Sequence, residues 1–158
     1  MRLGPQPGER IDRARRISFS FDGRSVQAHP GDTVASALVA AGQQVLSRSF
    51  KYHRPRGEFC FAGQCGHSMM EIDGWPGARA CGEVVRDGMI VHHINAWPGL
   101  GFDVMRAGDI VGSPFMGPGF YYKTFKWPRR MWPVYEKVLR NAAGLATLRA
   151  QQDEREWR

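Results

Sequence analysis

Residues 59–68 read FCFAGQCGHS and contain two of the three cysteines of this 158-residue chain. Cys60 and Cys65 lie five positions apart, with Gly63 and Gly66 beside them. Glycine adopts positive φ without a steric penalty, so such a loop can turn tightly and bring backbone N–H groups close to the sulfur atoms. This stretch therefore predicts a loop in which two thiolates bind one metal ion from the same side.

The wider spacing of the candidate ligands indicates an iron–sulfur cluster. Ser68 follows Cys65 by three positions, and Cys81 lies thirteen residues beyond it. Cys-x4-Cys-x2-Cys followed by a distant cysteine is the plant-type [2Fe–2S] spacing, and here a serine stands at the third ligand position. The sequence thus predicts Cys60, Cys65, Ser68 and Cys81 as cofactor-binding, metal-ligating residues. Because a hydroxyl loses its proton less readily than a thiol, we expect a serine-ligated cluster to be less stable and lower in potential.

Two other interpretations of the same residues stay open. Cys60, Cys65, His67 and Cys81 have the composition of a structural Cys3His zinc site, although Cys-x4-Cys-x-His is not a common zinc spacing. The loop could also hold free thiols and no metal. A disulfide is not expected in a chain without an export signal.

Composition limits the class of protein. Hydrophobic residues make up 42% of the chain, which is enough for one packed domain, and the formal net charge of +7 favours acidic partners. No apolar run approaches the roughly 20 residues that span a bilayer. Residues 1–16 are rich in Arg, Gly and Pro and lack the apolar segment of a secretory signal. We expect a flexible basic arm and a cytoplasmic location.

The next segment predicts a hairpin followed by a helix. Residues 17–28 alternate apolar and polar side chains around an Asp-Gly turn at 22–23. A turn then leads into a helix that ends near residue 42, with Asp32 or Thr33 as its N-cap. Hairpin followed by helix is the order that opens a β-grasp domain. The predicted fold class is therefore α+β, of the plant-type ferredoxin-like β-grasp kind.

Further strands are predicted on both sides of the cysteine loop. Residues 47–57 form a loop whose basic members, Arg54 and Arg56 among them, either pair with acidic groups of a partner or are simply solvated. Residues 69–72, 78–85 and 89–94 read as strands, which places Cys81 within a strand. The predicted ferredoxin-like domain thus covers residues 17–95.

The character of the sequence changes after residue 95. Residues 96–150 are predicted to form an aromatic docking arm and a helix with Pro133 in its first turn, and residues 151–158 a polar tail. Seven aromatic residues fall between 115 and 132 without clear periodicity. A segment of this kind cannot bury its apolar surface alone, so we expect it to pack against another domain or subunit.

Several stretches carry a resemblance to a known family. RSFKYHRPRG at 48–57, GFYYKTFKWP at 119–128 and GDTVASAL at 31–38 resemble the N-terminal region of the alpha subunit of heterotetrameric sarcosine oxidase. The cysteine loop resembles the ferredoxin-like subunits of hydrogen cyanide synthase and of opine and hydroxyproline dehydrogenases. The resemblance covers roughly residues 10 to 148.

The resemblance implies a function. Proteins of this family are multi-subunit flavin enzymes that oxidise secondary amines or amino acids, with FAD or FMN on flavoprotein subunits. This chain would be their [2Fe–2S] electron-transfer subunit, without catalytic residues of its own, and Cys60, Cys65 and Cys81 carry over as ligands. An alternative is a cluster-free assembly subunit of the same kind of complex. A less favoured one is a nucleic-acid-binding module, since Lys and Arg alternate with aromatics in 119–130.

Overall fold

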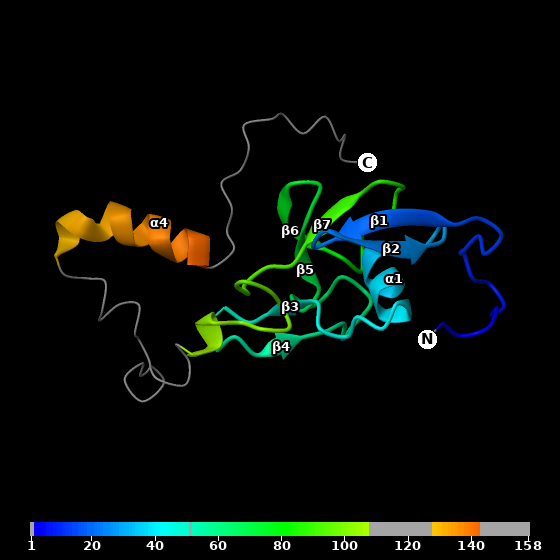
Figure 1. Cartoon of the computed structure of the whole chain (residues 1–158), viewed down its shortest axis with the longest axis horizontal. Helices are drawn as coiled ribbons and strands as arrows, with labels where there is room; N and C mark the ends of the chain where they lie inside the picture. Colours follow the sequence, from blue (N-terminus) through cyan, green and yellow to red (C-terminus); the bar gives the residue numbers. More distant parts are fainter. Residues whose placement is uncertain (1, 51, 108–127, 143–158) are drawn as a thin grey trace.

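The computed structural model describes residues 2–50, 52–107 and 128–142, and it shows an α+β architecture (Figure 1). The elements in chain order are β1 (Ile17–Phe21), β2 (Arg24–Ala28), α1 (Val34–Ala40), β3 (Ser47–Arg48), β4 (Pro55–Arg56), β5 (Met69–Ile72), β6 (Trp75–Arg79), β7 (Ile90–His92), η1 (Arg129–Met131) and α4 (Trp132–Ala142). The aromatic stretch 115–127 and the tail 151–158, on which two sequence predictions rest, lie outside the described residues.

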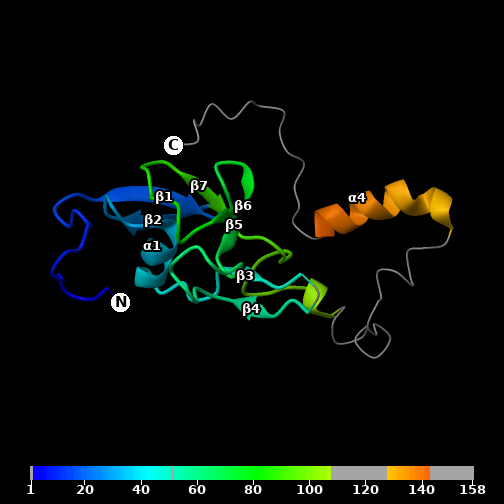
Figure 2. The same ribbon diagram turned by 180° about the vertical axis from the view of Figure 1, so that it is seen from behind.

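Five strands form one mixed sheet in the order β2-β1-β7-β5-β6. The β1–β7 pair is parallel, whereas the other neighbours pair antiparallel. Helix α1 lies against β1 and β2 (Figures 1 and 2). The core joins Val34 and Leu38 of α1 with Phe19 of β1, Ile72 of β5 and Val91 of β7. The apolar faces predicted for the first strand and the helix therefore meet in one core.

The β1–β2 hairpin and helix α1 confirm the strongest local predictions. Asp22 and Gly23 have φ values of 51° and 77°, the left-handed pair that a two-residue hairpin turn requires. Thr33 is the N-cap of α1, because its hydroxyl accepts a hydrogen bond from Ser36 N–H at 3.2 Å. The Ser36 hydroxyl in turn accepts from Thr33 N–H at 3.0 Å, which completes a capping box. Gly42, at φ 90°, follows the end of the helix.

Asp32, the other N-cap candidate, has a different role. Its side chain is fully buried and accepts hydrogen bonds from His29 N–H and the Ser36 hydroxyl. The guanidinium of Arg2 binds both carboxylate oxygens, at 2.8 and 2.6 Å. A Cβ atom on Gly31 would lie 2.2 Å from the carbonyl oxygen of Arg10, so the N-terminal segment runs in direct contact with the turn before α1.

The strand predicted over residues 78–85 is wrong in its position. Strand β6 ends at Arg79, and Cys81 lies in the turn that follows. The backbone carbonyls after β6 accept hydrogen bonds from helix α1 and do not continue the strand. Val34 N–H donates to Glu83 O at 2.9 Å, and Ala35 N–H donates to Ala80 O at 3.0 Å. These bonds satisfy two of the N–H groups that the first turn of a helix leaves without an internal partner.

Two further predictions need adjustment. The predicted loop 47–57 contains a small two-stranded sheet, β3–β4, and the last strand is shorter than predicted, Ile90–His92.

A buried polar cluster connects the β3–β4 region to the chain beyond residue 95. Nδ1 of His53 lies 2.8 Å from Oδ2 of Asp103, and Arg48 donates to the carbonyls of His53 and Leu100. His53, which lies within the predicted loop 47–57, is buried at 5% exposure, so this part of the loop is not solvated.

Helix α4 begins at Trp132, so Pro133 stands in its first turn as predicted. Its apolar residues Trp132, Val134 and Val138 are between 48% and 61% exposed. In the described part of the chain, no helix has both the length and the apolar character needed to cross a membrane.

Candidate iron–sulfur site

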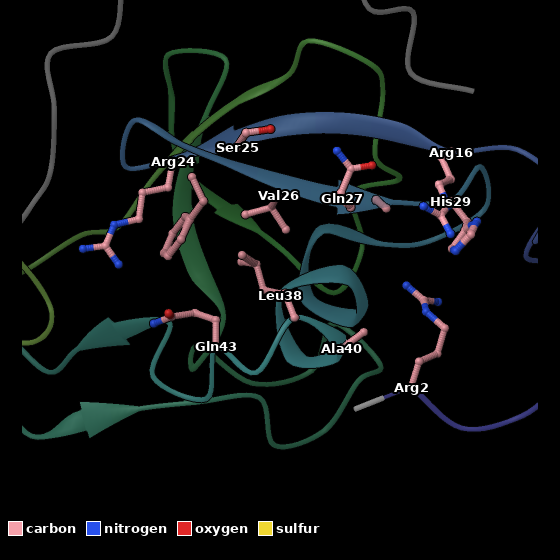
Figure 3. Close-up of a pocket in the computed structure, with 13 residues that line it drawn as sticks. Arg2, Arg16, Arg24, Ser25, Val26, Gln27, His29, Leu38, Ala40 and Gln43 are labelled. Atoms are coloured by element: carbon pink, nitrogen blue, oxygen red, sulfur yellow. The ribbon is translucent and has the colours of Figure 1, made fainter.

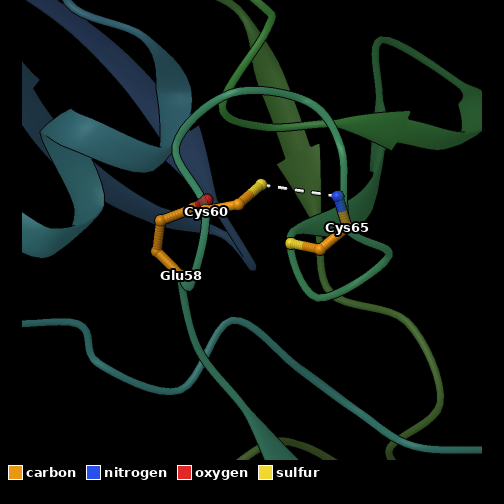
Figure 4. A group of neighbouring side chains, drawn as sticks. All are labelled: Glu58, Cys60 and Cys65. Atoms are coloured by element: carbon orange, nitrogen blue, oxygen red, sulfur yellow. Dashed lines mark hydrogen bonds between the residues drawn. The ribbon is translucent and has the colours of Figure 1, made fainter.

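The structure brings Cys60 and Cys65 together as the sequence predicts. The N–H of Cys65 donates a hydrogen bond to Sγ of Cys60 at 3.4 Å (Figure 4). The loop between them turns through two left-handed residues, Phe61 at φ 49° and Gly63 at φ 68°. The N–H of Phe61 is held by Oε1 of Glu58 at 3.1 Å. The loop thus folds around the Cys60 sulfur.

The environment of Cys60 favours its thiolate. Hydrogen bonds from the Ala62 N–H, from the Cys65 side chain and N–H, and from the Gln64 N–H lower the pKa of Cys60 to about 7. A metal ligand must be deprotonated, and a thiol with this pKa is about half ionised at neutral pH. Backbone N–H groups directed at a sulfur are also the means by which proteins stabilise iron–sulfur ligands.

Glu58 is a member of the site that the sequence analysis missed. One of its carboxylate oxygens and the sulfurs of Cys60 and Cys65 all lie within 4.8 Å of one another (Figure 4). Within the described ranges, no other three His, Cys, Asp or Glu side chains are grouped this closely. Oε2 of Glu58 is buried and has no hydrogen-bond partner. The only sequence signal was an acidic residue two positions before Cys60.

The other two candidate ligands form a second pair. The Ser68 hydroxyl donates a hydrogen bond to Sγ of Cys81 at 3.3 Å, and both residues are buried, at 0% and 8% exposure. The β5–β6 hairpin explains their meeting. Met69 pairs with Arg79, and Ala80 N–H donates to Ser68 O at 2.9 Å, so the residues that flank the two strands are held side by side.

Short contacts fix the chain between the two pairs. The Ser47 hydroxyl of β3 donates to the carbonyl of His67 at 3.1 Å, and the Arg56 guanidinium of β4 lies 3.5 Å from the carbonyl of Gly66. The small β3–β4 sheet therefore anchors the second half of the cysteine loop. A Cβ on Gly57 would lie 2.4 Å from Gln44 O, so only glycine fits where this loop leaves β4.

The donor set fits a two-iron cluster in its chemistry and its pairing. Each iron of a [2Fe–2S] cluster needs two protein ligands, and the chain presents the pairs Cys60–Cys65 and Ser68–Cys81. Three donors are thiols, and the fourth is a buried hydroxyl that can bind iron only after losing the proton it now gives to Cys81. The residues present therefore fit the group in donor type, with a hydroxyl at the position where a fourth thiol would stand.

The zinc interpretation fits less well. The ring of His67 packs against the ring of Phe59, with centroids 5.5 Å apart. Among the residues that the structure describes, neither His67 nor Cys81 belongs to the close group that Glu58, Cys60 and Cys65 form. The four donors Cys60, Cys65, His67 and Cys81 are thus not gathered as a closed tetrahedral site.

Hollows on the surface of the described residues include one beside the cysteine loop and one away from it. One, of 490 Å³, borders the cysteine loop and is lined by Tyr52, Arg54, Arg56, Phe59 and His67 among others. The other, of 530 Å³, lies between β2 and α1 and has an apolar floor that includes Val26 and Leu38, with Arg2, Arg16 and Arg24 at its rim (Figure 3). No residue of the cysteine loop lines the second hollow.

A small α+β domain with a mixed sheet and a paired thiol loop is compatible with a ferredoxin-like iron–sulfur domain. Residues 14–96 match the model of the 2Fe-2S iron-sulfur cluster binding domain family. The chain belongs to this family.

Its relatives include subunits of larger enzymes. Over 93% of its length the chain is 42% identical to sarcosine oxidase subunit alpha of Rhizobium meliloti, of which it spans 16%. Over 54% of its length it is 38% identical to hydrogen cyanide synthase subunit HcnA of Pseudomonas aeruginosa, of which it covers 78%. The L-proline dehydrogenase structure from P. horikoshii is 28% identical over 52% of the chain and 16% of that structure, with a TM-score of 0.46.

Proposed function

We propose that the chain is the [2Fe–2S] electron-transfer subunit or domain of a heteromeric flavin-dependent oxidoreductase that acts on amines or amino acids. The observation that carries the proposal is the double pairing of Cys60 with Cys65 and of Ser68 with Cys81. Two further findings support the proposal: the chain belongs to the cluster-binding family, and its sequence is similar to sarcosine oxidase subunit alpha. The β-grasp topology, a docking role for residues 96–150 and FAD or FMN on partner subunits are parts of the same proposal.

Each donor has a defined task in this proposal. Cys60 and Cys65 would hold one iron, and Cys81 with Ser68 would hold the other. A bound [2Fe–2S] cluster supplies reversible one-electron transfer. The N–H groups of residues 62, 64 and 65 favour the thiolate form of Cys60 by lowering its pKa. No residue of the chain is assigned to the chemistry of the substrate.

The test is the metal and sulfide content of the chain purified anaerobically in its native complex. The proposal expects about two irons and two acid-labile sulfides per chain, with the visible absorption of a [2Fe–2S] cluster. A colourless chain without iron, recovered with a flavin-containing partner, would contradict it.

A cluster-free assembly subunit is the second candidate, and one observation favours it. The buried Ser68 hydroxyl already has a partner in Cys81, so this pair is satisfied without iron. This candidate expects that replacing Cys60, Cys65 and Cys81 together by alanine leaves complex formation and turnover unchanged. Loss of turnover with an intact complex would reject it in favour of the electron-transfer role.

A further inference from the structure

The cysteine loop carries two exposed aromatic side chains on either side of a ligand. Phe59 and Phe61 are 76% and 55% exposed, and Cys60 lies between them. Exposed aromatic rings in water forgo the gain of burial, and clusters of such rings commonly mark contact sites for other proteins. Phe59 contacts the ring of His67 and is still 76% exposed, so packing within this chain does not account for the exposure of either ring.

The backbone holds Phe61 in a conformation that bulky residues rarely adopt. Its φ of 49° lies in the left-handed region, where a side chain meets steric resistance. The hydrogen bond from its N–H to Oε1 of Glu58 fixes this turn. A disfavoured backbone that also exposes an apolar ring points to a role for the ring outside the folded chain.

The hollow beside Phe59 gives this surface a charge. Arg54 and Arg56 line it, with the Arg54 guanidinium 5.0 Å from the ring centre of Tyr52. Glu58 is the acidic residue of its lining, and one oxygen of that carboxylate is engaged by Phe61 N–H while the other is buried. The solvent-exposed edge of this hollow is therefore basic, and the whole chain carries a net charge of +7.

We propose that Phe59, Phe61, Arg54 and Arg56 form the docking surface for the flavoprotein subunit, here called the aromatic rim. This inference rests on the proposed function and names the face that partner binds. Electron transfer weakens steeply with distance, so the ligand loop must lie at the contact. In a specific interface, aromatic side chains usually lie at the centre and polar and charged side chains surround them. The partner face is accordingly apolar at its centre and bordered by carboxylates.

The test uses the flavoprotein that copurifies with the tagged wild-type chain, identified by its bound flavin and then purified free. Binding of the wild-type chain is compared with F59A/F61A, R54E/R56E and the control I90A. Ile90 is 51% exposed on β7 and lies outside the aromatic rim, so I90A removes exposed apolar surface elsewhere on the domain. We expect F59A/F61A to weaken binding about 100-fold. R54E/R56E should slow association and reduce its salt dependence, and I90A should change affinity less than threefold.

Visible absorption and circular dichroism of each variant show whether the loop still folds. Amide hydrogen exchange of residues 58–62 should be slower in the wild-type complex than in the free chain. If the rings had only a structural role, complex formation would not slow this exchange. Unchanged affinity of F59A/F61A, or unprotected residues 58–62 in the complex, would overturn the proposal. So would self-association of the free chain that F59A/F61A abolishes, because the rim would then bind a second copy.

The outcomes separate this inference from the proposed function. A wild-type chain that holds no cluster, but whose F59A/F61A variant still loses the flavoprotein, supports the aromatic rim and refutes electron transfer. A cluster-containing chain whose variant binds normally refutes the aromatic rim alone.

Discussion

Ser68→Cys is the substitution that probes the site most sharply. Ser68 is fully buried, and its hydroxyl lies 3.3 Å from the sulfur of Cys81. In the metal-free chain this substitution has two costs. It removes the hydrogen bond of the Ser68 hydroxyl, worth about 0.5–1.5 kcal/mol, and the larger sulfur atom overpacks a closed site at a cost of about 1–3 kcal/mol. Because both costs apply, we expect the metal-free variant to be less stable than wild type by about 1.5–4.5 kcal/mol.

The cluster-loaded variant should behave in the opposite way. A fourth thiolate replaces a donor that binds only as an alkoxide, so we expect the cluster to survive chelator challenge at least about tenfold longer, with a higher reduction potential. The assay follows visible absorption during anaerobic incubation with a chelator, for wild type, S68C and S68A. S68A should lose its cluster fastest. Equal lifetimes in all three proteins would refute the assignment of Ser68 to the second iron.

Three further predictions concern other residues of the structure. Glu58→Gln removes an acidic side chain within 4.8 Å of two ligand sulfurs, so potentiometry should show a potential raised by roughly 40–150 mV for an effective dielectric of about 20–80. An unchanged potential would contradict the placement of this carboxylate beside the sulfurs. The pKa of Cys60 is lowered to about 7, so its alkylation in the metal-free chain should rise with a midpoint near pH 7, as thiolate replaces thiol; a midpoint near 9 would contradict the N–H contacts. Gly31 has φ 90°, and a Cβ there would lie 2.2 Å from Arg10 O, so Gly31→Ala should lower the free energy of unfolding by about 1–3 kcal/mol in denaturant melts. The control Gly101→Ala, where a Cβ meets open space, should leave the free energy of unfolding unchanged.

Local signals explain why much of the fold was predictable. The Asp-Gly turn at 22–23 and the capping box of Thr33 are determined by residues within four positions of each other, so the hairpin and α1 were predicted correctly. The turn at Cys81 was not predictable in this way. Its backbone carbonyls are used by the first turn of α1, a partner more than forty residues earlier in the chain.

The site divides along the same line. The pairing of Cys60 with Cys65 follows from their spacing and from Gly63 between them, and the structure shows it. The meeting of Ser68 with Cys81 depends on the β5–β6 register, which spacing alone does not give. The approach of Glu58 depends on the left-handed turn at Phe61, which no local residue preference predicts for a phenylalanine.

Mössbauer spectroscopy of the complex grown on ⁵⁷Fe tests the central claim most directly, because it counts irons and distinguishes their ligands. The two donor pairs, Cys60–Cys65 and Ser68–Cys81, predict two quadrupole doublets of equal area, and the iron with an oxygen ligand should have the larger isomer shift. A single doublet from one mononuclear iron, or no bound iron in a complex that still contains flavin, would contradict the account.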